Sequence, residues 1–154
     1  MQIDHVNIVV QDLEPMVAFY RDMLGLRVTK RVTITGPWVA ATVGLDEVHA
    51  DVVYLDFPTG PRIELIRYNR PALDRPFDVG QPNAPGLRHL AFKIDDIDAA
   101  TARLRSAGVR VFSDVQAVPD SQVTYAGGIR KRLVYFADPE GNLLELCEYK
   151  PQSA

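Results

Sequence analysis

The stretch VYLDFPTGPRIELIRY, residues 53–68, occurs twice in this chain of 154 residues. A shift of 81 residues places it without a gap on VYFADPEGNLLELCEY, residues 134–149, and seven of the sixteen positions are identical. A second block, HVNIVVQDL from His5, falls on HLAFKIDDI from His89 at a shift of 84 residues. Because the two blocks keep their order at nearly the same offset, the chain is predicted to be a duplicated unit.

Each copy predicts the same order of local structures. Residues alternate with the period of a strand at the start of each copy, and apolar residues then recur at helical spacing. An aspartate suited to cap a helix precedes each helical pattern, and a glycine suited to the left-handed residue after a helix follows it. The matching pairs are His5 and His89 in the strands, Asp12 and Asp96 at the caps, and Gly25 and Gly108 at the ends. The rest of each copy is strand-like and ends in a hairpin whose turn, FPTG or DPEG, contains Pro and Gly.

We therefore expect a single α+β domain over residues 1–154, made of two modules that each contain one helix and about four strands. Module one covers about 1–68 and module two about 87–150. Between them, a linker at about 69–86 holds four prolines and has no clear periodicity. A module of about 70 residues is marginal by itself, so the two copies are expected to bury a shared surface.

Composition predicts a small, soluble, mildly acidic protein of the cytoplasm. Seventeen basic and 20 acidic residues give a formal net charge of −3, and the one basic run, residues 130–132, is too short to indicate nucleic-acid binding. No stretch has the roughly 18 apolar residues that a membrane span needs, and the N-terminus lacks the basic and apolar regions of a signal peptide. Cys147 is the only cysteine, so an internal disulfide is not available.

The repeat isolates two histidines and two glutamates that are poor choices for packing inside a sheet: His5, His89, Glu64 and Glu145. Strand alternation places the apolar neighbours of each glutamate on the other face, which is expected to receive the helix. The four polar side chains then point away from the helices. Their nitrogen and oxygen atoms suit a divalent first-row metal ion such as Zn, Ni, Co, Mn or Fe. The spacing alone leaves a second interpretation open, in which the histidines are hydrogen-bonded core residues and the glutamates face water.

Three segments of the sequence resemble the vicinal oxygen chelate superfamily, the glyoxalase and bleomycin resistance group, which also contains dioxygenases. They are HVNIVVQDLEPMVAFYRDMLGLRV at residues 5–28, LRHLAFKIDDIDAATARLRSAGV at 87–109, and the second copy of the repeated stretch. The resemblance covers nearly the whole chain. It implies two βαβββ modules that form a curled, partly open barrel of eight strands with the helices outside.

The same resemblance implies a metal ion in the cleft, with His5, Glu64, His89 and Glu145 at the four metal-ligand positions of glyoxalase I. It implies a metal-dependent lyase or isomerase that transfers a proton next to a carbonyl of a small chelating substrate, as glyoxalase I (lactoylglutathione lyase) and methylmalonyl-CoA epimerase do. Glu145 is the first choice for the carboxylate that acts as base, and Glu64 is the second. Glutamate at position 64 favours the glyoxalase-like ligand set, because the epimerases commonly have glutamine there.

Two other activities of the superfamily stand as alternatives. A bleomycin resistance-like protein binds a drug without metal, and an extradiol dioxygenase holds Fe(II) with two His and one Glu, which leaves positions open for O₂. Four intact ligand positions argue against both. The expected partners are a small-molecule substrate and a second copy of the chain in a homodimer, with no nucleic acid and no membrane.

Several further polar residues have both a functional and a structural interpretation. Glu47 and His49 could add an acid or base to the cleft, but a solvated strand edge is the simpler interpretation. Cys147 shares a face with the second glutamate, yet a lone cysteine in a strand is more often a small buried hydrophobe. The basic run at 130–132 could hold a substrate phosphate or carboxylate, and the alternative is a solvated edge strand. Two more polar residues on the face of the histidines are Asn7 and Lys93.

Overall fold

The computed structural model describes residues 1–74, 80–123 and 125–151 of the chain. The chain divides into two compact units, Met1–Pro76 and Phe77–Ala154. The first unit carries module one and the second carries module two, and each module has one four-stranded sheet. Part of the predicted linker, residues 75–79, lies outside the described residues.

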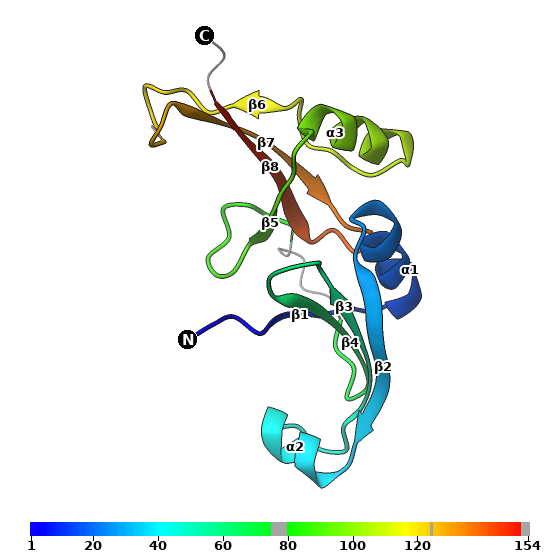
Figure 1. The fold of residues 1–154 in the computed structure, drawn as a ribbon. Helices are drawn as coiled ribbons and strands as arrows, with labels where there is room; N and C mark the ends of the chain where they lie inside the picture. The colour runs from blue at the N-terminus through cyan, green and yellow to red at the C-terminus, as the bar shows by residue number, and fades with distance from the viewer. Residues whose placement is uncertain (75–79, 124, 152–154) are drawn as a thin grey trace. The chain divides into compact units, whose positions relative to one another are not determined.

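Module one is a mixed sheet with helical segments (Figure 1). Its strands lie in the order β1-β4-β3-β2, with β1 parallel to β4 and the other pairs antiparallel. In chain order its elements are β1 (His5–Val9), α1 (Leu13–Ala18), the π-helix η1 (Phe19–Met23), β2 (Arg27–Thr35), α2 (Pro37–Val43), β3 (His49–Asp56) and β4 (Arg62–Arg70).

Module two repeats this arrangement. Its sheet has the order β5-β8-β7-β6, again with the first strand parallel to the last and the other pairs antiparallel. Its elements are β5 (His89–Lys93), α3 (Ile97–Ser106), β6 (Gln116–Ala117), β7 (Ile129–Ala137) and β8 (Leu143–Pro151). In both modules the strand after the helix lies at the edge farthest from the first strand. The shared βαβββ topology confirms the predicted duplication and fold class.

The helical segment after β1 packs on one face of the module one sheet. α1 and η1 follow each other directly, and their buried side chains include Met16 and Tyr20. α1 contacts β4, where Ile63 and Leu65 are buried. Since side chains alternate along a strand, Glu64 between them points to the opposite face, as the sequence predicts.

Module one contains a second helix, α2. The prediction of one helix per module is therefore wrong for module one. Only two residues of the sequence mark the ends of α2. Pro37 stands in its first turn, and Gly44, with φ of 70°, follows its last turn. The buried members of the apolar cluster beneath it are Val39, Val48, Ala50, Val52 and Ile66. Because Ile66 shares the strand face of Glu64, α2 covers the far end of that face.

The predicted helix ends are confirmed except for one cap. Gly25 and Gly108 both have φ of 75° and follow their helices in the left-handed conformation. The Asp96 carboxylate accepts a hydrogen bond from the backbone N–H of Ala99 at 2.9 Å, so it caps α3. The side chain of Asp12 makes no capping hydrogen bond, so that prediction is wrong. Within the described residues, no helix has the length and apolar character that a membrane crossing requires.

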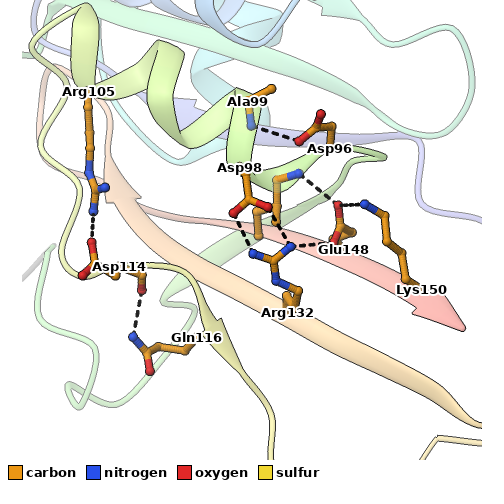
Figure 2. A network of polar contacts seen from close by, with 10 residues as sticks. Asp96, Asp98, Ala99, Arg105, Asp114, Gln116, Arg132, Glu148 and Lys150 are labelled. Carbon is orange, nitrogen blue, oxygen red and sulfur yellow. Dashed lines mark hydrogen bonds and ion pairs between the residues drawn. The ribbon is translucent and has the colours of Figure 1, made fainter. Parts of the chain in front are cut away.

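A buried glutamate joins α3 to the module two sheet (Figure 2). Glu148 on β8 is 1% exposed and accepts a hydrogen bond at 3.1 Å from the backbone N–H of Ile97, the first residue of α3. Its carboxylate also lies 2.8 Å from Lys150 Nζ and 3.3 Å from Arg132 Nη1. Arg132 in turn donates to both carboxylate oxygens of Asp98 on α3, at 2.6 and 2.8 Å. These contacts fix α3 over one face of β8.

The basic run at residues 130–132 lies on β7, an inner strand that pairs with β8 and β6. The interpretation of this run as a solvated edge strand is therefore wrong. The three cations have different partners, which are Asp120 for Arg130, Glu145 for Lys131, and Asp98 with Glu148 for Arg132. Strand alternation separates them, because Lys131 points to the face opposite that of Arg132.

The turn before β8 is expected to depend on Asp138. Its buried Oδ1 accepts hydrogen bonds from the backbone N–H groups of Glu140 at 3.1 Å and Asn142 at 2.8 Å. Asp138→Ala removes this acceptor, so the free energy of unfolding should fall by about 2 kcal/mol, as measured by urea unfolding. Asp120→Ala, which removes an exposed carboxylate, is the control and should cost less than about 0.5 kcal/mol. Equal losses in the two variants would contradict this prediction.

Candidate metal centre

In module one, His5 and Glu64 lie near each other on the parallel strands β1 and β4. The Nε2 atom of His5 is 3.5 Å from Glu64 Oε2. Asn7 is the register partner of Glu64, and its Nδ2 donates a hydrogen bond to the same oxygen at 2.7 Å. The other ring nitrogen, His5 Nδ1, lies 2.9 Å from Asp4 Oδ2. An Nδ1–H donated to Asp4 leaves the lone pair of Nε2 available to a metal ion.

A tyrosine completes the group in module one. Tyr54 on β3 is the register partner of Glu64 on β4. Its hydrogen bond to Glu64, together with burial and the negative charge of that carboxylate, raises the pKa of Tyr54 to about 12. Tyr54 therefore stays protonated at neutral pH and can donate to the carboxylate.

Module two contains the equivalent group. His89 Nε2 lies 3.3 Å from Oε2 of Glu145, whose residue exposure is only 3%. Lys131 Nζ lies 2.7 Å from the other carboxylate oxygen, Oε1. Tyr135 is the register partner of Glu145, and its ring centre is 5.2 Å from that of His89. Burial, followed by the charge of Glu145, raises the pKa of Tyr135.

Both modules therefore place a tyrosine beside the His–Glu pair, which the sequence analysis did not assign to the site. The signal was present, because Tyr54 and Tyr135 are identical positions of the repeat. It was missed because tyrosine is also a common strand residue. The polar neighbours that differ between the modules are Asn7, which is equivalent to Ala91, and Lys131, which is equivalent to Ala50.

The donor atoms of each pair fit a divalent metal ion. Ligand atoms about 2.0–2.2 Å from a zinc ion lie about 3 to 3.5 Å from each other. The observed separations are 3.5 Å in module one and 3.3 Å in module two. Glu145 Oε1 is buried and has no aligned hydrogen bond in the described part of the chain, although Lys131 lies near it. Within either unit, the described residues bring no third His, Cys, Asp or Glu close enough to complete a metal site. Each module thus offers two of the four predicted ligands.

Of the other residues considered from the sequence, Cys147 lies close to the pair of module two, whereas Glu47 and His49 lie apart from the pair of module one. Cys147 is 5% exposed on the face of Glu145, and burial is the main cause that raises its pKa, so the thiol stays protonated. His49 begins β3, where its Nδ1 is 3.1 Å from Asn69 Nδ2. Glu47 is exposed before β3 with φ of 52°. In the described structure, neither Glu47 nor His49 joins the His–Glu pair of module one.

Almost the whole chain matches one protein-family model. The model of the Glyoxalase/Bleomycin resistance protein/Dioxygenase superfamily matches residues 2–146. The chain belongs to this superfamily. Membership confirms the resemblance found in the sequence, and the matched range includes both His–Glu pairs.

The superfamily relatives of the chain include an epimerase. A 2-epi-5-epi-valiolone epimerase from Actinomyces sp is 32% identical over 148 residues, which cover 94% of this chain and 77% of the epimerase. The Escherichia coli (strain K12) protein YaeR, described as uncharacterized, is 34% identical over 149 residues, which cover 96% of this chain and 95% of YaeR. The crystal structure of a glyoxalase family protein from Bacillus cereus has a TM-score of 0.80 and 29% identity, covering 97% of this chain and 94% of that one.

Proposed function

We propose that this protein is a metal-dependent isomerase or lyase that moves a proton next to a carbonyl group of a small substrate able to chelate the metal. His5, Glu64, His89 and Glu145 would hold one divalent cation, with Zn, Ni, Co, Mn and Fe as the candidates. The observation that carries the proposal is the repeated His–Glu pair, with nitrogen–oxygen separations of 3.5 Å and 3.3 Å at equivalent positions of the two modules. Similarity to an epimerase supports proton-transfer chemistry.

The carboxylates of the pairs would handle the proton. When bound, the cation supplies Lewis acidity toward the substrate oxygens. Glu145 and Glu64 both lie on the sheet face that carries the histidines, and each has a tyrosine as register partner, so either carboxylate can act as the base. We assign this role first to Glu145 and second to Glu64. Both phenols are protonated at neutral pH, and the raised pKa values of Tyr54 and Tyr135 extend this protonation to more alkaline pH. A carboxylate held beside such a donor keeps its orientation while it removes a proton and returns it.

Metal content tests the proposal that the four ligands hold one cation. Protein purified without chelator, then equilibrated with Zn, Ni, Co, Mn or Fe(II) and freed of excess ion, should hold one cation per chain, because each module offers only two ligands. Elemental analysis against protein concentration gives this ratio. A ratio of zero would contradict metal dependence, and a ratio of two would contradict a site shared by the two modules.

The proposal also includes the homodimer and the small-molecule substrate. Light scattering should give a mass of twice 17.2 kDa for a dimer. A mass equal to one chain would contradict the homodimer. It would not bear on the metal site, which the ratio of cation to chain tests.

A further inference from the structure

Two lysines of module two approach the same tyrosine ring. Lys131 Nζ lies 5.8 Å and Lys93 Nζ lies 5.9 Å from the centre of the Tyr149 ring. Tyr125 packs edge-on against that ring at a centroid distance of 5.5 Å. The Tyr149 ring is therefore held by an aromatic neighbour and attracts two ammonium groups to its π system. We name Lys93 and Lys131 the lysine pair.

The lysine pair lies on the sheet face that carries His89 and Glu145. Lys93 follows His89 by four residues on β5, and Tyr149 follows Glu145 by four residues on β8. An even separation along a strand keeps side chains on one face. Lys131 connects the two groups, because its Nζ is also 2.7 Å from Glu145 Oε1. A ligand held by the His–Glu pair of module two would thus lie next to the lysine pair.

Module one carries no charge at the equivalent positions. The repeat places Val9 at the position of Lys93, Ala50 at that of Lys131 and Tyr68 at that of Tyr149. Ala50 and Tyr68 belong to, or pack against, the apolar cluster beneath α2. Module two has no helix between α3 and β7 in its described residues. The same end of the sheet that is covered by a helix in module one is therefore cationic in module two.

Glu145 does not balance the charge of both lysines. Lys131 Nζ lies 2.7 Å from Glu145 Oε1, so this single carboxylate faces one of the two ammonium groups. Lys93 adds a second positive charge on an exposed residue. If Glu145 also binds the cation of the proposed function, positive charge exceeds negative charge on this face. Such a face attracts and orients an anion.

We propose that the lysine pair binds a carboxylate or phosphate group of the substrate, so that the proposed isomerase acts on an anion. Ammonium groups donate charge-assisted hydrogen bonds to either anion, and the Tyr149 ring supplies an apolar wall beside them. Because Lys131 reaches both Glu145 and the Tyr149 ring, the anionic group lies close to the reacting carbon. The role as a substrate site rests on the proposed function, whereas the anion site itself is formed by module two alone.

Titration of the chelator-treated full chain with inorganic phosphate and with propionate tests the lysine pair. In NMR spectra, the backbone amide signals of Lys93, Lys131 and Tyr149 should shift with either anion, and the neutral analogue propionamide should leave them in place. Lys93→Gln should weaken anion binding about tenfold. Lys93→Arg keeps the charge and should retain most of the binding. The anion that binds more tightly identifies the preferred group of the substrate.

Lys150→Gln is the matched control, since Lys150 lies on the other face of β8 and pairs with Glu148. It should leave anion binding unchanged. An equal loss in Lys93→Gln and Lys150→Gln, or no shift at the lysine pair with either anion, would overturn the proposal. The two proposals fail separately. A chain that binds a cation but no anion refutes only the lysine pair as an anion site, and one that binds the anion but no cation refutes only metal dependence.

Discussion

A Glu145→Gln protein is expected to bind the divalent cation about 100-fold more weakly than the wild type. The change keeps the size of the side chain and replaces an anionic ligand by a neutral amide. His89, whose Nε2 is 3.3 Å from Oε2 of Glu145, would remain as the one predicted ligand of module two. Lys131 would lose its counter-charge at 2.7 Å and would repel the cation. Competition with a chromophoric chelator measures the change in Kd.

Matched variants separate loss of a ligand from general damage to the protein. Glu148→Gln makes the same chemical change three residues along β8 on the opposite face, and it should leave the Kd for metal unchanged. In module one, His5→Ala should weaken binding as strongly as Glu145→Gln, whereas His49→Ala should not. Wild-type affinity in Glu145→Gln, or a full cation retained in His5→Ala, would show that the two modules do not share one site.

The composition of each His–Glu pair could be predicted because two simple rules act together. Side chains alternate along a strand, so the burial of Ile63 and Leu65 beneath α1 determines the face of Glu64. The parallel pairing of β1 with β4 then sets Asn7 opposite Glu64, which brings His5 to a position two residues away on the same face. The repeat transfers this result to β5 and β8 without further information.

Helix α2 could not be predicted because its stability comes from tertiary packing. The segment PWVAATV has seven residues and includes Trp, Val and Thr, which are only moderate helix formers. It lies between strand-like residues with similar apolar content. Helices of this length are not stable in isolation, and Val39 gains its burial only from the cluster on the sheet. The local sequence therefore carried a turn signal at Gly36 and Pro37 but no helical periodicity.

The separate partners of the basic run also depend on long-range structure. Three adjacent cations resemble one solvated surface feature when only the local sequence is considered. Lys131 contacts Glu145 because β7 pairs with β8 and both side chains lie on the same face of the sheet. β7 is also an inner strand, because β6 pairs with its other edge. That status depends on β6, which has two residues, Gln116 and Ala117, and is too short to produce a strand pattern. The local sequence thus shows Lys131 as a cation but does not show that Glu145 is its partner.

Glu148→Ala is expected to lower the free energy of unfolding by about 3 kcal/mol, which corresponds to a fall in Tm of about 6–12 °C for a chain of this size. The variant leaves the buried N–H of Ile97 without its acceptor at 3.1 Å. It also removes the carboxylate between Arg132 and Lys150 and leaves a small cavity under α3. Calorimetry of the metal-free protein measures the change. A Tm within 2 °C of the wild type, which is about 1 kcal/mol or less, would show that α3 is held by its other contacts.

Glu148→Gln separates the charge of this residue from its hydrogen bond, and pH makes the difference measurable. The amide oxygen can still accept from Ile97, so the variant should lose less stability than Glu148→Ala at neutral pH. In the wild type, burial raises the pKa of Glu148, but the hydrogen bonds from Lys150 and Ile97 outweigh it and hold the pKa below its ordinary value of 4.5. A carboxylate with a lowered pKa in the folded state stabilises the protein above its ordinary pKa, and this contribution is lost as pH falls toward the lowered value. The free energy of unfolding, measured with urea, should therefore fall less between about pH 5 and about pH 3 in Glu148→Gln than in the wild type. Equal losses would mean that the charge of Glu148 does not hold α3 on the sheet.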